Sequence, residues 1–319
     1  MIYIEASSTL RLRPSHLLLM IYRYLSGVYQ AGDLFALNYI KGFMDGKSAS
    51  KPERILTVSG HGIGEAETWL AERMDDCRID TVSFRMIDTQ LLQFLRAAGR
   101  EDIETIFSKF AEMVAPYPLL LELASDAGLV PYWCDQAQDI QRYFQRQKIT
   151  VFSDHPLCIE TSCHYDLIYV SHGMQYFSVD AAEKLRQHLS PEGWLAILMP
   201  PADGNANGDR FARFSSSMVA RESKTLFRKL LESRGYALAP LPTGSPDLRN
   251  LAVRRELSRF NVLASAKSVL LGELILASLG EHISDRTRME ILNETAAQFN
   301  GLSMPVNEEL ELLIIEAKS

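Results

Sequence analysis

Three alternating glycines near residue 60 constrain what this chain can fold into. They follow a short apolar run that begins at Ile55, and the stretch is Gly60-His61-Gly62-Ile63-Gly64. Apolar residues at helical spacing then run from Ala66 to Met74. Glycine permits positive φ and close approach of a ligand to the backbone, and the first amides of a helix favour anions. Strand, tight turn and helix therefore predict a small-molecule cofactor loop, with close packing of helix on strand as the alternative explanation.

Further apolar runs predict a sheet around this stretch. After the first strand we expect strands at 79–84, 149–152, 166–171, 194–199, 236–239 and 310–316. Helical patterns alternate with several of these runs, which is typical of right-handed crossovers in a doubly wound, mostly parallel α/β sheet. The run at 194–199 is continuously apolar, as in strands that are buried on both faces of a central parallel sheet.

The remaining segments predict helices and set the domain organisation. Two apolar stripes in residues 14–45 predict two N-terminal helices, joined at 27–32 by a plain connection or by a turn over a pocket. Four segments follow from this: an N-terminal helical segment 1–50, an α/β domain 51–319, an inserted helical cap 102–147, and a mainly helical segment 251–299.

Composition excludes several classes of function. The net charge of -7 and the isoelectric point near 5.6 argue against nucleic acid as a partner. The apolar stretch 17–22 is interrupted by Arg23, so neither a membrane span nor a signal peptide is expected, and we predict a cytoplasmic protein. The four cysteines lack the close paired spacing of zinc sites, so no metal is expected. The oligomeric state is left open.

Two later motifs, taken with the glycine stretch, resemble the class I S-adenosylmethionine-dependent methyltransferases. They are Tyr165-Asp166-Leu167-Ile168-Tyr169 and the turn that ends Ser190-Pro191-Glu192-Gly193. Within that class the chain is similar to the histamine N-methyltransferase family, through residues 55–65, His172-Gly173-Met174-Gln175-Tyr176-Phe177 and the ending 310–317. The resemblance covers roughly residues 15–240 and the final strand. It implies a class I methyltransferase-like fold, S-adenosylmethionine as cofactor, and methyl transfer to an amine or other heteroatom of a small metabolite.

The resemblance also implies roles for individual residues. The residues implied to surround the cofactor are Gly60, His61, Gly62 and Gly64 around its methionine and ribose, Asp154 near its adenine, and Ser171 with His172 behind its sulfonium. His172 and Tyr176 are the candidate catalytic residues, and Tyr176 would face the substrate. The candidate substrate-binding residues are Tyr29, Gln175, Phe211 and Glu308.

The chain departs from the family at two positions. Phe84 occupies the place in the cofactor site where family members carry an acidic residue that accepts both ribose hydroxyls. Asp88 is a possible substitute, although a carboxylate one turn into a helix more commonly caps that helix. Val28 stands where a carboxylate contacts histamine in that family, so histamine itself is not the expected substrate.

Two other functions stay open from the sequence. Arg85 after the second strand could pair with the 2′-phosphate of NADP in an oxidoreductase, although the third glycine comes one residue too early for that motif. A methyltransferase-like scaffold that has lost its ribose ligand could instead bind a metabolite or a protein partner without catalysis. Asp166 begins its strand, about 16 Å from the ligand end at about 3.3 Å per residue, so we expect a structural role for it.

Overall fold

A computed structural model gives the structure of the chain. It describes residues 4–5, 11–25, 27–46, 52–59, 64–74, 76–152, 155–158, 164–171, 179–199, 229, 232–233, 235, 248–265, 267, 270–271, 283–297 and 302–318. Within these ranges, the side chains of residues 5, 27–31, 259–264, 296 and 303–309 are outside the description.

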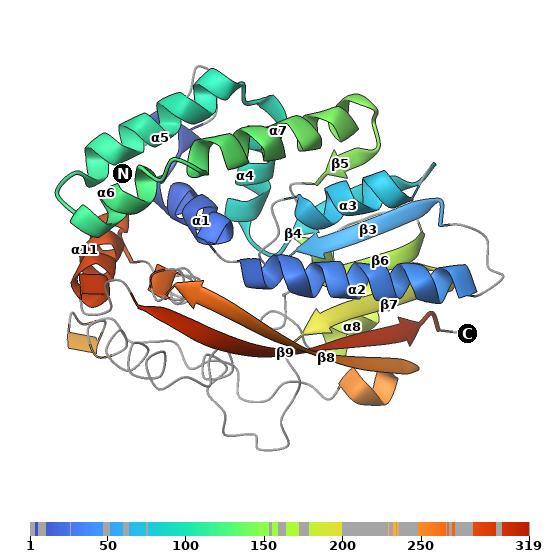
Figure 1. Cartoon of the computed structure of the whole chain (residues 1–319). Coiled ribbons are helices and arrows are strands. Elements are labelled where there is room, and N and C mark those ends of the chain that lie inside the picture. Colours follow the sequence, from blue (N-terminus) through green and yellow to red (C-terminus); the bar gives the residue numbers. More distant parts are fainter. Residues whose placement is uncertain are drawn as a thin grey trace.

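A mixed sheet forms the centre of the molecule (Figure 1). Its strands are β3 (Arg54–Ser59), β4 (Arg78–Ser83), β5 (Ile149–Val151), β6 (Tyr165–Ser171), β7 (Leu189–Met199), β8 (Arg254–Ser265) and β9 (Ser303–Glu316). They lie in the order β5-β4-β3-β6-β7-β9-β8. The strands from β5 to β7 are parallel, whereas β9 is antiparallel to both of its neighbours. The predicted doubly wound, mostly parallel, class I methyltransferase-like fold is therefore confirmed.

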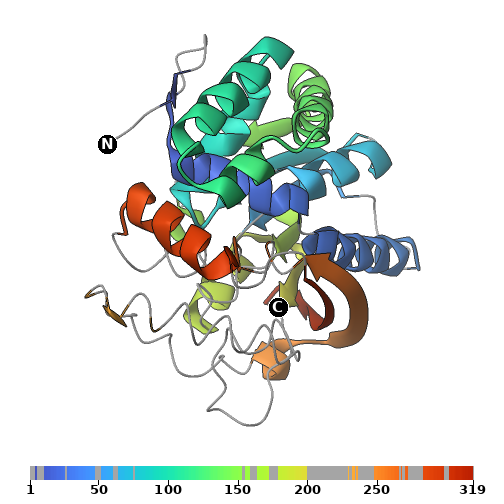
Figure 2. The same cartoon turned by 60° about the vertical axis from the view of Figure 1, so that its left-hand side comes forward.

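Helices cover both faces of the sheet and enclose two hydrophobic cores. The described helices are α1 (Pro14–Leu25), α2 (Gly27–Gly46), α3 (Glu65–Arg73), α4 (Met86–Ala97), α5 (Arg100–Val114), α6 (Pro118–Ala124), α7 (Leu129–Gln145), α8 (Val179–Arg186) and α11 (Asp285–Ala296). Side chains of α1 to α7 share the larger core with one face of the sheet, and α8 packs on the other face. Helix α11 packs against α6, beside the sheet (Figure 2).

The predicted helices of residues 14–45 and 102–147 correspond to observed elements. Residues 27–32 belong to the start of α2, so the structure has a helix there, and both expectations for these residues, the plain connection and the turn over a pocket, are wrong. Between 102 and 147 the chain forms most of α5 and all of α6 and α7, and α7 packs on α3 and α4. In the described part of the chain, no helix has the length and the apolar character needed to cross a membrane.

The segment 251–299 was expected to be mainly helical, and this expectation is wrong for its first part. Residues Arg254–Ser265 form the edge strand β8, which pairs with β9 in antiparallel register from Arg254 opposite Ile314 to Ser265 opposite Ser303. An edge strand has a solvated side and tolerates charged residues, so its sequence lacks a simple apolar alternation. Pairing with β9 therefore decided the structure of this segment.

Smaller differences concern the ends of strands. β7 begins at Leu189, so residues 190–193 belong to a strand with an irregular register and not to a separate turn. A short hairpin of β1 (Ile4–Glu5) and β2 (Arg11–Leu12) was not predicted. The strand predicted at 236–239 lies outside the described residues.

Candidate cofactor site

The candidate site lies at the carboxyl ends of β3 and β6, where the winding of the sheet reverses. β3 pairs with β4 on one side and with β6 on the other, so the crossovers that leave these strands diverge at this point. Open α/β sheets bind their ligands in the crevice at such a switch point. The glycine stretch follows β3 here. Its residues 60–63 lie outside the described part of the chain, and Gly64 is described.

Three neighbouring strands end in a row of serines. In the sheet register Ser59 of β3 lies beside Ser83 of β4 and beside Ser171 of β6. Two residues earlier in each strand, Thr57 lies beside Thr81 of β4 and beside Tyr169 of β6. Because alternate residues of a strand share a face, these six hydroxyl groups point to the side covered by α2, α3 and α4. The carboxyl edge of the sheet is therefore polar on one face.

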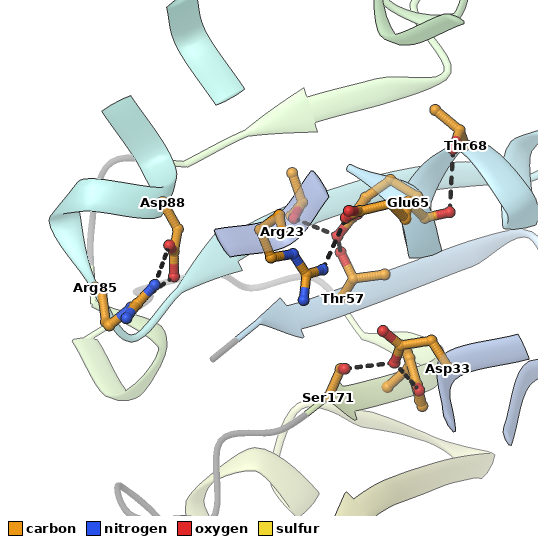
Figure 3. A network of polar contacts seen from close by, with 11 residues as sticks. Arg23, Asp33, Thr57, Glu65, Thr68, Arg85, Asp88 and Ser171 are labelled. Atoms are coloured by element: carbon orange, nitrogen blue, oxygen red, sulfur yellow. Dashed lines mark hydrogen bonds and ion pairs between the residues drawn. The ribbon is translucent and has the colours of Figure 1, made fainter. Parts of the chain in front are cut away.

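Asp33 of α2 binds the two hydroxyl groups of this row that belong to β6. Its Oδ1 accepts hydrogen bonds from the Tyr169 hydroxyl at 2.6 Å and from the Ser171 Oγ (Figure 3). Asp33 is buried, with 5% of its surface exposed. Burial, and then the neighbouring Asp33 carboxylate, raise the pKa of Tyr169 well above its ordinary value, so the phenol remains a hydrogen-bond donor. Ser171 donates its hydrogen to Asp33 and keeps oxygen lone pairs that can face the crevice.

Glu67 of α3 occupies the equivalent place over β3 and β4. Its Oε1 accepts hydrogen bonds from Thr57 Oγ1 at 2.5 Å and from Thr81 Oγ1 at 2.9 Å. Its Oε2 has no hydrogen-bond partner among the described residues, and the side chain is 2% exposed. Burial raises the pKa of Glu67 because the charged form is poorly solvated there.

A small pocket lies next to Glu67, between the ends of β3 and β4. It is open to solvent, and the space between its walls amounts to about 240 Å³ when that open solvent is included. Polar groups and the last glycine of the turn form much of its wall, which consists of Ser59, Gly64, Glu67, Thr81, Val82, Ser83, Asp88, Thr89, Leu92 and Val151.

An ion pair connects the N-terminal helices to the glycine turn. Arg23, near the end of α1, has 1% of its surface exposed, and its Nη2 donates to Glu65 Oε2 at 3.0 Å. Glu65 is the first residue of α3 and directly follows Gly64. Burial by itself would lower the pKa of Arg23, but the nearby carboxylates of Glu65 and Asp33 raise it. Figure 3 shows Arg23, Glu65, Asp33 and Ser171 together beside the ends of β3 and β6.

The end of β4 differs from the expected ribose site. Phe84 is 8% exposed and packs in the core on the opposite face of the sheet, with its ring 5.5 Å from that of His155. Arg85 Nε donates to Asp88 Oδ2 at 2.9 Å and Arg85 Nη2 donates to Asp88 Oδ1, so the pair is bidentate (Figure 3). Ser83 Oγ also lies 3.0 Å from Asp88 Oδ2.

These contacts bear on two expectations about Asp88 and Arg85. Asp88 was considered as a substitute ribose acceptor or as a helix cap, but its carboxylate is bound to Arg85 and the first turn of α4 has no side-chain cap. Arg85 was considered for the 2′-phosphate of NADP, but its side chain is buried in the pair with Asp88. Asp88 nevertheless forms part of the pocket wall, with its carboxylate held by Arg85 and Ser83, whereas Arg85 does not line that pocket.

The geometry at Gly64 supports the alternative explanation of this glycine, which is close packing of the helix on the strand. Its φ is +103°, a conformation that side chains rarely adopt. A Cβ there would lie 2.9 Å from Cδ1 of Ile140 and 3.2 Å from Cδ1 of Leu92. The third glycine of the stretch is therefore needed for close packing of the turn against α4 and α7.

The predicted site residues fall into three groups. The structure describes Gly64, Ser171 and Phe84. Gly64 and Ser171 lie at the switch point, whereas Phe84 packs in the core on the opposite face of the sheet. Tyr29 and Glu308 lie in α2 and β9, with their side chains outside the description. The predicted residues outside the described part of the chain are Gly60, His61, Gly62, Asp154, His172, Gln175, Tyr176 and Phe211. Asp166 is structural as predicted, because it accepts hydrogen bonds from the backbone of Glu53 and Arg54 at the amino ends of the strands.

The sequence interpretation missed the carboxyl groups that meet the hydroxyl row. Asp33, Glu67 and Arg23 were not among the candidates, although a signal for the row was present in the sequence. Three strands end in the same pattern of hydroxyl, valine and serine: Thr57-Val58-Ser59, Thr81-Val82-Ser83 and Tyr169-Val170-Ser171. Polar residues repeated at the same end of three apolar strands indicate a shared polar surface.

Comparison with known proteins finds solved structures that resemble this chain only at low sequence identity and low TM-score. No protein-family model matches the chain, and no curated protein sequence matches it. Among solved structures, a phosphoethanolamine N-methyltransferase 2 of Haemonchus contortus has a TM-score of 0.38 at 11% identity over 88% of this chain, which spans 53% of that enzyme. A putative sarcosine dimethylglycine methyltransferase of Galdieria sulphuraria has a TM-score of 0.38 at 15% identity, covering 89% of this chain and 85% of that one. A methyltransferase of Geobacter sulfurreducens in complex with S-adenosylhomocysteine has a TM-score of 0.39 at 10% identity, covering 94% and 98%.

Proposed function

We propose that this chain is an S-adenosylmethionine-dependent methyltransferase that acts on an amine or another heteroatom of a small metabolite. The observation that carries the proposal is a polar switch point, between β3 and β6, in a class I methyltransferase-like sheet. Such switch points are where open α/β sheets bind their ligands. Transfer of a methyl group from a sulfonium requires little covalent chemistry from the protein, because positioning the acceptor in line supplies most of the rate.

The described side chains at the switch point suit the charged methionine half of the cofactor. That half carries an ammonium, a sulfonium and a carboxylate, and the carboxylates of Asp33 and Glu65 and the guanidinium of Arg23 lie near the ends of β3 and β6. When bound, S-adenosylmethionine supplies an electrophilic methyl group. The residues of this chain would orient the cofactor, hold the acceptor and exclude water.

Residues that lie outside the description remain part of this proposal. We assign His172 and Tyr176 to the surroundings of the reacting atoms, as the sequence resemblance implies. The other residues that we assign on the same basis are Gly60, His61, Gly62 and Asp154 for the cofactor, and Tyr29, Gln175, Phe211 and Glu308 for the substrate.

A second candidate function is a methyltransferase-like scaffold that binds a metabolite or a protein partner without catalysis. The end of β4 favours it, because Phe84 replaces the acidic ribose ligand and Arg85 holds Asp88. A missing charged acceptor for the ribose hydroxyls would weaken cofactor binding by roughly 1.5–3 kcal/mol. No described contact favours the NADP-dependent oxidoreductase, since Arg85 is held by Asp88.

Calorimetric titration of the purified full chain tests these functions. We expect S-adenosylmethionine or S-adenosylhomocysteine to bind with a Kd below about 100 μM, which corresponds to about -5.5 kcal/mol, and NADPH not to bind. A Gly62→Val variant should lose this binding while keeping the wild-type circular dichroism spectrum, because its side chain would occupy the expected path of the ligand. Absence of binding of both adenosyl compounds to the wild type would contradict the methyltransferase.

Transfer of a labelled methyl group then separates catalysis from binding. We expect label from S-adenosylmethionine to appear on at least one member of a panel of small primary, secondary and tertiary amines, alcohols and thiols. Tight binding of the cofactor without transfer to any member of the panel would favour the non-catalytic scaffold.

A further inference from the structure

One carboxyl oxygen of the residues that line the small pocket has no partner. Glu67 belongs to the pocket wall and is 2% exposed, and its Oε1 accepts hydrogen bonds from the hydroxyl groups of Thr57 and Thr81. Its Oε2 is buried and has no hydrogen-bond partner among the described residues. A buried polar atom without a partner is costly, so such an atom beside a pocket indicates a group that a ligand can satisfy.

The surroundings of Glu67 favour its neutral acid form. Burial is the main cause that raises the pKa of this carboxyl group, and the nearby charge of Glu65 adds to the effect. In a carboxylic acid one oxygen carries the proton and donates, whereas the other oxygen accepts. Because Oε1 already accepts two hydrogen bonds, the proton belongs on Oε2, which is then a donor without an acceptor.

The pocket around this donor is balanced in charge. The other acidic side chain in its wall is Asp88, and the bidentate pair with Arg85 balances the charge of that carboxylate. The rest of the wall consists of hydroxyl groups, backbone and apolar side chains such as Leu92 and Val151. An anion would lie beside the Asp88 carboxylate, and a cation would meet a donor in place of an acceptor. The pocket therefore suits an uncharged group that accepts a hydrogen bond.

The cofactor of the proposed function has one charged half and one uncharged half. Its methionine half carries an ammonium, a sulfonium and a carboxylate, whereas its nucleoside half is uncharged at neutral pH and presents two ribose hydroxyl groups. The pocket lies between the ends of β3 and β4, one strand away from the switch point between β3 and β6. A ligand with its charged half at the switch point can therefore extend its uncharged half over the pocket.

We propose that Glu67 donates a hydrogen bond from Oε2 to a ribose hydroxyl oxygen of the cofactor and so selects an uncharged group at this place. The inference rests on the proposed methyltransferase function. It assigns to Glu67 a role in recognition of the ligand, in addition to the structural role of joining α3 to β3 and β4.

Variants of Glu67 in the full chain separate a neutral donor from a charged acceptor, with S-adenosylhomocysteine as the calorimetric probe. Glu67→Gln keeps an oxygen for the two threonines and puts an N–H donor in the place of Oε2, so we expect binding no more than about twofold weaker than in the wild type. Glu67→Met has a similar length and no donor, and we expect binding at least about fivefold weaker. Thr57→Val is the matched control, because it removes one hydrogen bond to Oε1 and leaves Oε2 in place, and its affinity should stay within about twofold of the wild type.

Analogues of the probe identify the group that Glu67 contacts. We expect either the 2′-deoxy or the 3′-deoxy form of S-adenosylhomocysteine to bind the wild type more weakly than the parent compound, and Glu67→Met to weaken that form no further. If both analogues are weakened by Glu67→Met as much as the parent compound, Glu67 contacts neither hydroxyl group and the proposal is overturned.

The variants also distinguish failure of the inference from failure of the function. A loss of more than about twofold in Glu67→Gln shows that the ligand needs the charged carboxylate, and unchanged binding in Glu67→Met shows that it needs neither form. Either result overturns the role of Glu67 and leaves the methyltransferase function standing. Failure of the wild type to bind S-adenosylmethionine and S-adenosylhomocysteine overturns the function and the inference with it.

Infrared difference spectroscopy keeps the inference testable if Glu67→Met does not fold. The carbonyl band of a protonated carboxyl group is separate from the bands of ionised carboxylates, so a band of the wild type that is missing from Glu67→Gln belongs to Glu67. We expect S-adenosylhomocysteine to shift this band, because Oε2 gains an acceptor. A wild type without this band, or a band that stays in place when the probe binds, overturns the proposal.

Discussion

The buried pair of Arg85 and Asp88 gives the sharpest test of how the end of β4 is built. The side chains are 4% and 1% exposed, and two hydrogen bonds join them in bidentate geometry. Replacing Asp88 with asparagine leaves a guanidinium buried beside a neutral amide. Arginine cannot release its proton to relieve this, so the full penalty remains. We expect Asp88→Asn to lower the free energy of unfolding by roughly 3–5 kcal/mol, the usual cost of breaking a buried ion pair by removing one partner.

A double-mutant cycle isolates the interaction from the substitutions themselves. Arg85→Met removes the cation, and the double variant Arg85→Met, Asp88→Asn buries no charge at this place. We expect the double variant to lose at least about 2 kcal/mol less than the sum of the two single losses. The exposed pair of Arg100 and Glu104, at 69% and 48% exposure, provides the control, and Glu104→Gln there should cause no measurable loss.

Urea denaturation followed by circular dichroism measures these free energies by linear extrapolation. Strict additivity of the two single variants, or an Asp88→Asn loss no larger than that of Glu104→Gln, would refute the argument that the pair is a buried structural unit. Loss of cofactor affinity in Asp88→Asn without loss of stability would instead show that Asp88 is presented to the ligand.

Two further predictions concern Glu67 and Gly64. Burial raises the pKa of Glu67 above its ordinary value of 4.5, so the free energy of unfolding of the wild type should fall as pH rises from about 4.5 through the higher folded pKa. The glutamine in Glu67→Gln does not titrate, so the free energy of unfolding of this variant should rise relative to the wild type over the same pH range. Parallel pH profiles of the two proteins would contradict the assignment. Gly64→Ala should cost roughly 1–3 kcal/mol in urea denaturation because φ is +103° and Ile140 is in the way, whereas Gly99→Ala, at negative φ, should cost less; equal costs would contradict the strain.

The hydroxyl row links the fold to the candidate site. Polar groups under a sheet edge are costly unless they are hydrogen-bonded, and helices α2, α3 and α4 each supply one carboxyl group that receives them: Asp33, Glu67 and Asp88. The helices that cover this face are thereby fixed to the end of the sheet where the ligand is expected. Substitutions that shift these helices should therefore change the positions of the polar groups at this end of the sheet.

The sequence by itself determined the class of fold. Continuous apolar runs and β-branched residues specify central strands, and glycines specify the turn after β3, because these preferences act within a few residues along the chain. The strands β3 to β6 were accordingly located within a few residues, whereas β7 and β9 begin at Leu189 and Ser303, well before the predicted starts at residues 194 and 310. The repeated ending of hydroxyl, valine and serine also lay in the sequence, and it marked the polar edge of the sheet.

Only the tertiary structure decided which groups meet at that edge. Arg23 and Glu65 are 42 positions apart in the chain, and Asp33 and Ser171 are 138 positions apart, so their contacts depend on how α1 and α2 pack on the sheet. The same holds for β8, whose charged sequence becomes a strand through pairing with β9. Secondary-structure preferences act over a few neighbouring residues. Ion pairs and the pairing of β8 with β9 instead join residues that are far apart in the sequence and that meet only when the hydrophobic cores form.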